Sequence, residues 1–255
     1  MPKLNDGLVD HKLTTGSYGY SAVHLDDLGA SEYTLVTIVQ DVSGSVLGFK
    51  DEMETCLKAI IKSCKYSPRA DNLMIRLVGF NTQLNEIHGF KLLDECNEGD
   101  YDGILHCSGG TSLFDAAENA IAASSSYGQN LTKNGYDVNS IVIILTDGCD
   151  NGSALTELSV NAALKDAMRA ENLESIITVL VGVGVGQYPE IGTRLTDFKD
   201  KGGLTQFIDI KDADAKTLAK LADFISQSIS AQSQSLGTGC TSTPLNPKSV
   251  GFLNF

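Results

Sequence analysis

The sequence predicts an α/β fold: a doubly wound, mainly parallel central sheet flanked by helices on both faces, with one antiparallel edge strand. Three observations support this prediction. Short runs of β-branched and apolar residues recur along the chain, as strands covered on both faces require. Segments with an apolar stripe at helical spacing separate these runs. The 255 residues are enough for one such unit with additions at its ends.

The first predicted strand is Tyr33 to Gln40, whose sequence YTLVTIVQ has apolar side chains on both faces. A short loop, DVSGSVLG, follows it. The next segment has the spacing of an amphipathic helix. Its apolar face consists of Phe49, Met53, Cys56, Leu57, Ile60, Ile61 and Cys64. Strand, loop and helix in this order form the first part of a parallel βαβ unit.

The same alternation continues to residue 229. Further predicted strands are residues 73–80, 141–145, 176–183 and 205–210, of which the last is an edge strand. Residues 83–90 alternate more weakly, and we expect them to form an antiparallel hairpin with the strand before them. Further predicted helices are residues 113–123, 155–170, 191–198 and 213–229. This alternation predicts a mainly parallel sheet with right-handed crossovers.

The ends of the chain lie outside this alternating core. We predict an N-terminal extension, a folded domain and a tail rich in Ser, Thr and Gly, over residues 1–30, 31–233 and 234–255. In the extension, an alternating patch around Tyr20 is expected to add a strand or an arm. The apolar end of the tail, residues 249–255, is expected either to pack on the domain or to bind a partner.

Charge and hydropathy narrow the classes of partner. With 19 Lys and Arg against 32 Asp and Glu, the formal net charge is -13. Such a chain repels phosphate backbones and anionic lipid surfaces, so neither nucleic acid nor a membrane is an expected partner. The N-terminus lacks the basic start and apolar run of a signal peptide, and no stretch is long and apolar enough to span a bilayer. We therefore expect a cytoplasmic protein.

Six cysteines are scattered through the chain without a C-x-x-C pair. In the expected cytoplasmic setting, reduced and mostly structural thiols are the favoured interpretation, and a zinc site held by cysteines is not expected. They are Cys56, Cys64, Cys96, Cys107, Cys149 and Cys240.

Side chains with hard oxygen donors lie in three loops of the predicted fold, two of which directly follow a predicted strand. Asp41 follows the first buried strand, and Ser43 and Ser45 come after it at spacings of two. Asp147 follows the strand IVIIL, and Thr111 lies in a loop ahead of a predicted helix. Because the carboxyl ends of parallel strands meet at one edge of a sheet, these loops are expected to share a crevice. Such donors suit Mg²⁺, with Mn²⁺ or Ca²⁺ as alternatives.

The three loops carry recognisable motifs: D-V-S-G-S at residues 41–45, G-G-T-S-L at 109–113 and L-T-D-G at 145–148. Together they resemble the metal-ion-dependent adhesion site (MIDAS) of von Willebrand factor A domains. All five ligand positions of that family are matched, by Asp41, Ser43, Ser45, Thr111 and Asp147. The resemblance covers residues 33 to about 229, and its strength lies in the order of the motifs, each after the right kind of strand.

The resemblance implies a role for each ligand. The hydroxyls of Ser43 and Ser45 would bind the ion directly, and Asp41 would act through water. Thr111 and Asp147 would alternate between direct and water-mediated contact. Neutral hydroxyls and water quench the charge of the ion less than carboxylates do, so its open position attracts an anionic oxygen. The expected partner is a protein that supplies an Asp or Glu to the metal.

Other interpretations of these residues remain open. Asp41 and Ser43 taken singly are typical of an Asx or Ser turn that caps the following helix. A phosphatase of the haloacid dehalogenase kind needs a second carboxylate two residues after the first, where this chain has Ser43. The glycines at 182, 184 and 186 lack the G-x-G-x-x-G spacing of a dinucleotide loop, and they are expected to allow close packing of a strand on a helix.

These observations favour a divalent-cation-dependent protein-interaction module, an adaptor or scaffold without enzymatic activity. The alternatives are a Mg²⁺-dependent hydrolase that activates water and a structural domain whose loops the metal staples together. The segment F-I-S-Q-S-I-S-A-Q-S, residues 224–233, and the compact layout are similar to bacterial standalone A domains of the tellurium-resistance type. That similarity implies a setting in a bacterial stress-response complex.

Overall fold

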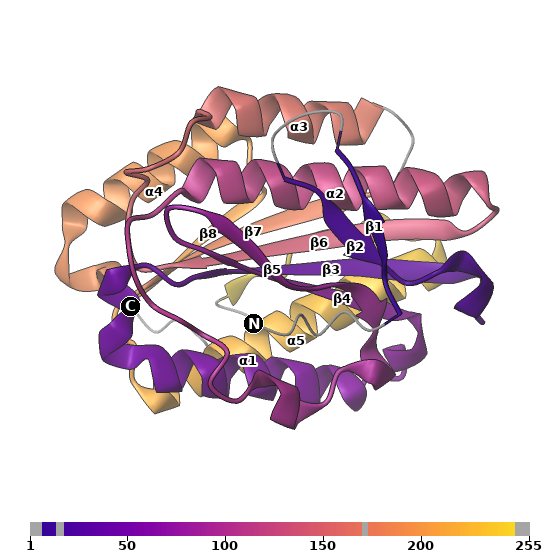
Figure 1. Cartoon of the computed structure of the whole chain (residues 1–255), viewed down its shortest axis with the longest axis horizontal. Helices are drawn as coiled ribbons and strands as arrows, with labels where there is room; N and C mark the ends of the chain where they lie inside the picture. The colour runs from indigo at the N-terminus through magenta and orange to yellow at the C-terminus, as the bar shows by residue number, and fades with distance from the viewer. Residues whose placement is uncertain (1–6, 14–17, 170–172, 248–255) are drawn as a thin grey trace.

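The computed structural model describes residues 7–13, 18–169 and 173–247. Within these ranges, eight strands form one sheet in the order β1-β2-β5-β4-β3-β6-β7-β8 (Figure 1). Their bounds are β1 Val9–His11, β2 Tyr20–Ala22, β3 Glu32–Asp41, β4 Leu73–Phe80, β5 Leu84–Leu92, β6 Asp137–Thr146, β7 Ile176–Val183 and β8 Gln206–Ile210. The five strands β4, β3, β6, β7 and β8 are mutually parallel. Strand β5 is antiparallel to β4, as the predicted hairpin requires.

Helices cover both faces of this sheet (Figure 1). On one face lie α1 (Lys50–Lys65) and α5 (Ala215–Thr238), and on the other α2 (Leu113–Lys133), α3 (Glu157–Arg169) and α4 (Pro189–Gly202). Short 3-10 turns connect them: η1 Leu25–Asp27, η2 Gly44–Phe49, η3 Ala70–Asn72, η4 Leu93–Glu95, η5 Glu98–Tyr101 and η6 Val185–Gln187. The doubly wound α/β architecture predicted from the sequence is therefore confirmed.

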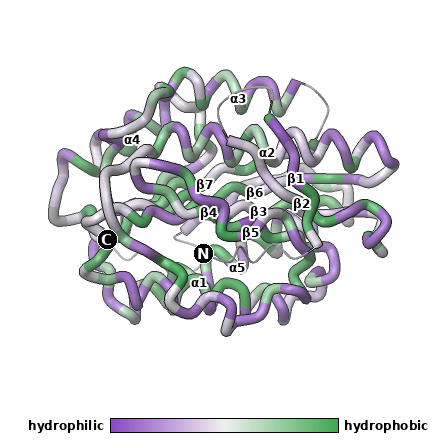
Figure 2. The backbone as a smooth tube through the Cα atoms, viewed as in Figure 1, coloured by the Kyte–Doolittle hydropathy of each residue, from purple (hydrophilic) through white to green (hydrophobic). Residues whose placement is uncertain are grey.

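The central strands are unbroken apolar runs because both of their faces are buried under helices. In β3, Val36 and Ile38 pack in the core under α1 and α5, whereas Val39 packs in the core under α2, α3 and α4. Strand β6 divides in the same way, and all ten of its residues except Asp137 are buried. The hydropathy colouring of Figure 2 shows apolar stretches along the central strands and alternating apolar and polar residues along the helices.

Three helices extend well beyond their predicted ends, and one of them is α4, which was expected over residues 191–198 and spans Pro189–Gly202. Helix α2 was expected to end at residue 123 but continues to Lys133, and its last turns bury Tyr127 and Leu131. Helix α5 was expected to end at residue 229 but continues to Thr238 through a polar segment. There the side chain of Gln232 donates to the carbonyl oxygen of Ser140, 3.1 Å away, and its backbone carbonyl accepts from Asn139, 2.7 Å away. Polar groups on β6 thus form hydrogen bonds with a face of α5 that carries few apolar residues.

The segment expected as an N-terminal strand or arm forms the hairpin β1–β2, which pairs with the edge of the sheet through β5. Tyr20 is buried there against Phe90 and Tyr127. The predicted end of the third helix at residue 170 and the apolar tail at 249–255 lie outside the described residues. All six cysteines lie in the described residues and are free thiols. No described helix has the length and apolar character needed to cross a bilayer.

Candidate metal site

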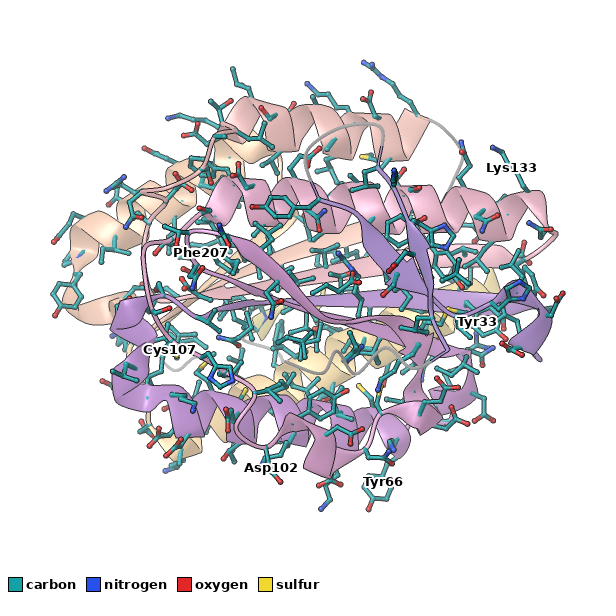
Figure 3. All side chains as sticks on the ribbon, viewed as in Figure 1. Tyr33, Tyr66, Asp102, Cys107, Lys133 and Phe207 are labelled. Atoms are coloured by element: carbon teal, nitrogen blue, oxygen red, sulfur yellow. The ribbon has the colours of Figure 1, made fainter. Side chains whose placement is uncertain are left out.

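The site expected from the sequence lies at the carboxyl edge of the sheet. Strands β3 and β6 are parallel neighbours, with Gln40 opposite Leu145, so Asp41 at the end of β3 and Asp147 just after β6 leave the sheet side by side. In Figure 3 this edge is on the side where Cys107 is labelled, and Tyr33 marks the opposite edge. The order of parallel strands thus places the motifs of Asp41 and Asp147 next to each other.

Backbone hydrogen bonds fasten the motif of Thr111 to that of Asp41. The amide of Gly44 donates to the carbonyl oxygen of Gly109 over 3.2 Å, and the amide of Ser108 donates to Val42 over 2.9 Å. Gly109 has a φ of 75°, a left-handed conformation that favours glycine. A Cβ at Gly109 would also lie 2.8 Å from the Thr82 hydroxyl. This glycine lets the loop before Thr111 lie close to its neighbours.

Asp41 is fully buried and has its carboxylate fixed from two sides. Its Oδ1 accepts from the amide of Ser43 at 2.8 Å, and its Oδ2 accepts from the hydroxyl of Thr146 at 2.6 Å. Burial raises the pKa of Asp41 to about 6, and the nearby charge of Asp147 adds to this effect against the lowering effect of the hydrogen bonds. A divalent cation beside the carboxylate would favour its charged form again.

A chain of hydrogen bonds joins three of the predicted ligands. Ser45 Oγ donates to Asp147 Oδ1 at 2.9 Å, and the hydroxyls of Ser43 and Ser45 are 3.1 Å apart. A hydroxyl has one proton, so Ser43 is the donor in the second bond. Both serine oxygens therefore keep a lone pair outside the chain. Partial burial raises the pKa of Asp147, while the hydrogen bond from Ser45 lowers it.

Thr111 is positioned from the opposite side, by the loop after β6. It is 4% exposed, and its amide donates to Asn151 Oδ1 at 2.8 Å. Its carbonyl oxygen accepts from the amides of Asn151 and Gly152. The structure therefore brings the side chains of Ser43, Ser45 and Asp147 into direct contact. Asp41 is held beside them by the amide of Ser43 and the hydroxyl of Thr146. Thr111 is held by Asn151.

The donor set fits a hard divalent cation. An octahedral Mg²⁺ with bonds of 2.0–2.1 Å has neighbouring ligand oxygens about 3 Å apart. The separations along Ser43, Ser45 and Asp147 are 3.1 and 2.9 Å. Among the described residues, no three His, Cys, Asp or Glu side chains form a cluster that could hold a metal. Hydroxyl oxygens would consequently have to supply most of the protein ligands.

Sequence reasoning missed or left undecided three residues around the site. Thr146, within the motif L-T-D-G, bonds to Asp41 and to the backbone of Gly148. The sequence leaves open whether Asp150 and Asn151 extend an acidic rim around the site or cap the next helix. Instead, Asp150 accepts from the amide of Phe114 in α2 at 3.3 Å, and Asn151 holds Thr111. Sequence alone would signal only Thr146, by its place in the motif.

The helix-capping interpretation of Asp41 is half right. The bond from the Ser43 amide to Asp41 Oδ1 is the Asx-type turn expected for such an aspartate taken singly. It closes the loop before η2, however, and α1 begins after Phe49 without a side-chain cap. The turn therefore shapes the loop that carries the serines and leaves Asp41 Oδ2 to Thr146.

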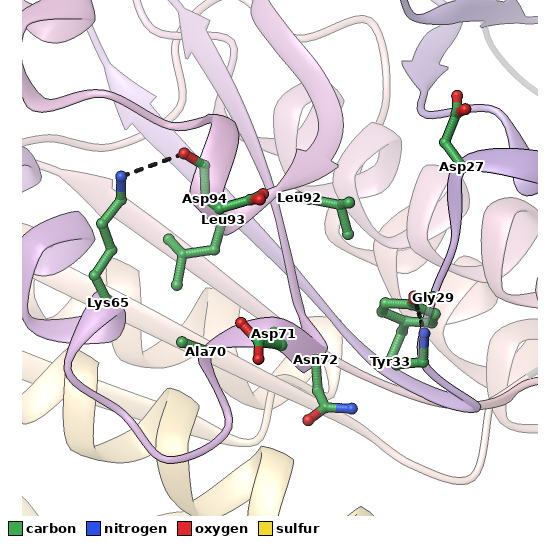
Figure 4. Close-up of a pocket in the computed structure, with 11 residues that line it drawn as sticks. Asp27, Gly29, Tyr33, Lys65, Ala70, Asp71, Asn72, Leu92, Leu93 and Asp94 are labelled. Atoms are coloured by element: carbon green, nitrogen blue, oxygen red, sulfur yellow. Dashed lines mark hydrogen bonds between the residues drawn. The ribbon is translucent and has the colours of Figure 1, made fainter.

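A second hollow lies at the opposite edge of the sheet (Figure 4). It has a volume of about 730 Å³ and is lined by residues that include Tyr33, Lys65 and Asp94. Tyr33 and Asp41 are eight residues apart on β3, which corresponds to about 26 Å. Lys65 Nζ donates to the backbone oxygen of Asp94 at 3.5 Å, and the carboxylates around the hollow belong to exposed residues. We interpret it as a solvated groove.

Comparison with known proteins reveals likeness in structure only. Neither a protein-family profile nor a curated protein sequence matches the chain. Among solved structures, the D319A mutant of the PilB minor pilin from Streptococcus sanguinis matches with a TM-score of 0.58 and 17% identity, over 86% of this chain and 66% of that chain. The pilus adhesin SpaC from Lactobacillus rhamnosus GG matches with a TM-score of 0.54 and 14% identity, over 79% and 30%.

A third match carries a metal ion in a MIDAS motif. Proximal thread matrix protein 1 from the mussel byssus, with a zinc-occupied MIDAS motif, has a TM-score of 0.50 and 18% identity, over 78% of this chain and 46% of that chain. The chain spans less than two thirds of the length of these three structures. At such identities the likeness shows the fold alone, an α/β fold of the von Willebrand factor A or Rossmann-like kind.

Proposed function

We propose that this chain is a protein-interaction module that binds a partner's carboxylate through a divalent cation. Ser43, Ser45 and Thr111 supply the neutral ligands, and Asp41 and Asp147 supply charge and orientation. Mg²⁺ is the proposed ion because all of the donors are hard oxygens. The observation that carries the proposal is the convergence of Ser43, Ser45 and Asp147, whose side-chain oxygens from two loops come into hydrogen-bond contact at the carboxyl edge of the sheet.

The charge of the site supports a carboxylate as the missing ligand. A cation held mainly by hydroxyls and water keeps most of its positive charge, so an open position favours an anionic oxygen. Ser45 is exposed and Asp147 is half-buried, so the site faces solvent at the edge of the sheet. An Asp or Glu on a protruding segment of another protein has the length and charge to reach it.

Two alternatives are less well supported. A hydrolase that activates water on the ion needs a general base, and among the hydrogen bonds described at the five predicted ligands none is to a histidine. For a structural staple, hydrogen bonds such as that from Gly44 to Gly109 already join the loops. Because the loops are joined without the ion, a role for the ion in binding a partner is better supported than a role in holding the loops together. The cytoplasmic location and the bacterial stress-response setting remain predictions from the sequence.

Direct titration tests the metal site. We expect Mg²⁺ and Mn²⁺ to bind the metal-free chain with one site in isothermal titration calorimetry. Ser45→Ala and Asp147→Asn should weaken binding at least tenfold, because each removes a predicted ligand or its charge. Asp166→Asn, an exposed carboxylate on α3, is the matched control and should bind as the wild type does. Equal affinities in all four proteins would refute the metal site.

An acidic peptide array tests the interaction itself. The wild-type chain, loaded with Mg²⁺, should bind a subset of peptides that contain Asp or Glu and should lose them when that residue becomes Asn or Gln. Chelation or Ser45→Ala should abolish the same signals, and Asp166→Asn should retain them. Binding that survives both chelation and Ser45→Ala would contradict metal-bridged recognition, whatever the titration shows.

A further inference from the structure

The loops around the metal site carry almost no charge besides the predicted ligands. They run over residues 42–49, 103–112 and 148–156, and Asp150 is the one Asp, Glu, Lys or Arg in these three ranges. In the whole chain, 20% of the residues are charged and the formal net charge is -13. The surface next to the ligands is therefore close to neutral, although the protein as a whole is strongly acidic.

The one charged side chain in these loops is already engaged. Asp150 Oδ1 accepts from the amide of Phe114 at 3.3 Å, and Asp150 Oδ2 accepts from the amide of Ser153 at 3.4 Å. At the start of α1, just outside the loops, Lys50 lies 3.8 Å from Glu54 on the next turn, so its charge has a partner too. A charged group of another protein would meet no unpaired Asp, Glu, Lys or Arg in these loops apart from the metal ligands.

One large apolar side chain protrudes beside the ligands. Leu47 is 64% exposed, although it lies only two residues after Ser45 in the 3-10 turn η2. Val46, between them, is buried in the core and anchors the turn. Two residues of a 3-10 helix advance by about 4 Å along its axis, so Leu47 is an immediate neighbour of the serine ligand. A segment of a partner that binds the ion would therefore cover Leu47 as well.

Two glycines leave open space next to Leu47 and Asp147. Gly48 follows Leu47, and Gly148 follows Asp147. At both glycines φ lies outside the left-handed range, and an added Cβ would meet no described residue within 4 Å apart from its own neighbours in the chain. Neither backbone conformation nor packing thus requires glycine at these positions. Bare backbone of this kind allows the backbone of another chain to approach closely.

A neutral, partly apolar surface discriminates between the residues that flank a bound carboxylate. A charged flanking side chain would lose water against these loops without gaining a partner, which costs free energy. An apolar flanking side chain is removed from water when it packs on Leu47, which is favourable. The centres of protein interfaces have the same character, because charged residues are depleted there and the surrounding contacts exclude water.

We propose that the partner presents its Asp or Glu between uncharged, apolar residues, and that Leu47 and Gly148 determine this preference. The preference rests on the metal-bridged function proposed above. The carboxylate binds the ion, a flanking apolar side chain packs on Leu47, and the backbone of the partner passes over Gly148. An acidic residue within a charged stretch binds the same ion more weakly, because its neighbours find no counter-charge in the loops.

Four synthetic peptides test the preference. Each has blocked ends and one central Asp, flanked on both sides by two Leu, two Ser, two Lys or two Glu. Binding to the Mg²⁺-loaded chain is measured by surface plasmon resonance in about 0.15 M NaCl, which largely screens the long-range attraction of Lys to an acidic protein. After subtraction of the signal in chelator, the Leu-flanked peptide should bind at least fivefold more tightly than each of the others. A smaller preference over any of the three would overturn the proposal.

Variants assign the preference to the two residues. Leu47→Asn should bind the Leu-flanked peptide no better than the Ser-flanked one. Gly148→Leu, whose side chain fills the open space, should weaken binding of all four peptides at least fivefold. Both variants should keep the Mg²⁺ affinity of the wild type in calorimetry. Met168→Asn, at a residue of α3 that is 67% exposed, is the matched control and should bind every peptide as the wild type does.

The outcomes separate the preference from the metal-bridged function. A preference for Leu that persists in Leu47→Asn, full peptide binding in Gly148→Leu, or loss of Mg²⁺ binding in either variant would overturn the roles of these residues. Mg²⁺-dependent binding that is equal for all four peptides would overturn the preference alone. Absence of Mg²⁺-dependent binding to any of them would contradict the metal-bridged function as well.

Discussion

Oδ2 of Asp41 accepts a 2.6 Å hydrogen bond from the hydroxyl of Thr146. The two residues end neighbouring parallel strands, β3 and β6. The bond therefore links the motifs D-V-S-G-S and L-T-D-G where they leave the sheet. Asp41 is fully buried, and Thr146 is 2% exposed. The orientation of the first aspartate therefore depends on a threonine that is not itself a predicted metal ligand.

Replacing this threonine should destabilise the domain. Thr146→Val removes the hydroxyl and leaves a buried carboxylate oxygen without its donor. We expect the free energy of unfolding to fall by about 1–3 kcal/mol, the range for an unsatisfied buried polar group. Urea unfolding in metal-free buffer measures the change. In the control Thr55→Val, an exposed hydroxyl that bonds within α1 is lost, and equal losses in the two variants would contradict the special role of Thr146.

His88 should make the stability depend on pH. It is buried on β5, where its ring bonds to Gly89 and to the hydroxyl of Tyr101. Burial, followed by the charge of Lys91, lowers the pKa of His88 from 6.5 to about 3. The unfolded chain therefore binds more protons than the folded chain between these values, so the contribution of His88 is present above pH 6.5 and is lost as the pH falls toward 3.

The pH effect has a measurable slope. Within this window His88 should contribute a loss of about 1.4 kcal/mol of unfolding free energy per pH unit. His88→Gln removes the titrating ring, so the pH profile should become flatter even if the variant is less stable at neutral pH. His106→Gln, which changes an exposed ring, should keep the wild-type slope. A wild-type slope in His88→Gln would show that other groups control acid unfolding.

The hairpin should depend on the absence of a side chain at Gly89. A Cβ at this position would overlap the carbonyl oxygen and the hydroxyl of Ser21, where β2 approaches β5. Gly89→Ala should therefore displace β2 and expose the hairpin to limited proteolysis. At Gly79, in the neighbouring strand β4, an added Cβ would be 3.6 Å from the nearest side chain, an ordinary contact. Resistance of Gly89→Ala equal to that of Gly79→Ala would refute the close approach.

The sequence predicts the core strands well because burial on both faces requires unbroken apolar runs. Strands β4 and β7 have the bounds that were predicted, 73–80 and 176–183. The late part of α5 could not be predicted in this way. Its polar residues are buried against Asn139 and Ser140 on a strand 92 or 93 positions away, and no local pattern indicates such a match.

The same limit applies to the candidate site. Asp41, Ser43, Ser45, Thr111 and Asp147 could be selected because each lies in a short motif next to a predicted strand or helix. Asn151 could not, because its role arises from a partner on another segment, Thr111.

Asn151 offers a final test that separates positioning from ligation. Its side-chain Oδ1 accepts from the backbone amide of Thr111. Its backbone amide donates to the carbonyl oxygen of Thr111, and the substitution leaves this second bond between the loops in place. Asn151→Ala leaves the buried amide of Thr111 without its acceptor, so it should lower the free energy of unfolding by about 1–3 kcal/mol. It should also weaken Mg²⁺ binding about tenfold, as the loss of an outer partner of a ligand does. Calorimetric titration measures the affinity, and Asn134→Ala, at the exposed end of α2, is the control. Full affinity in Asn151→Ala, alongside loss in Ser45→Ala, would show that Thr111 is not held in place by this side chain.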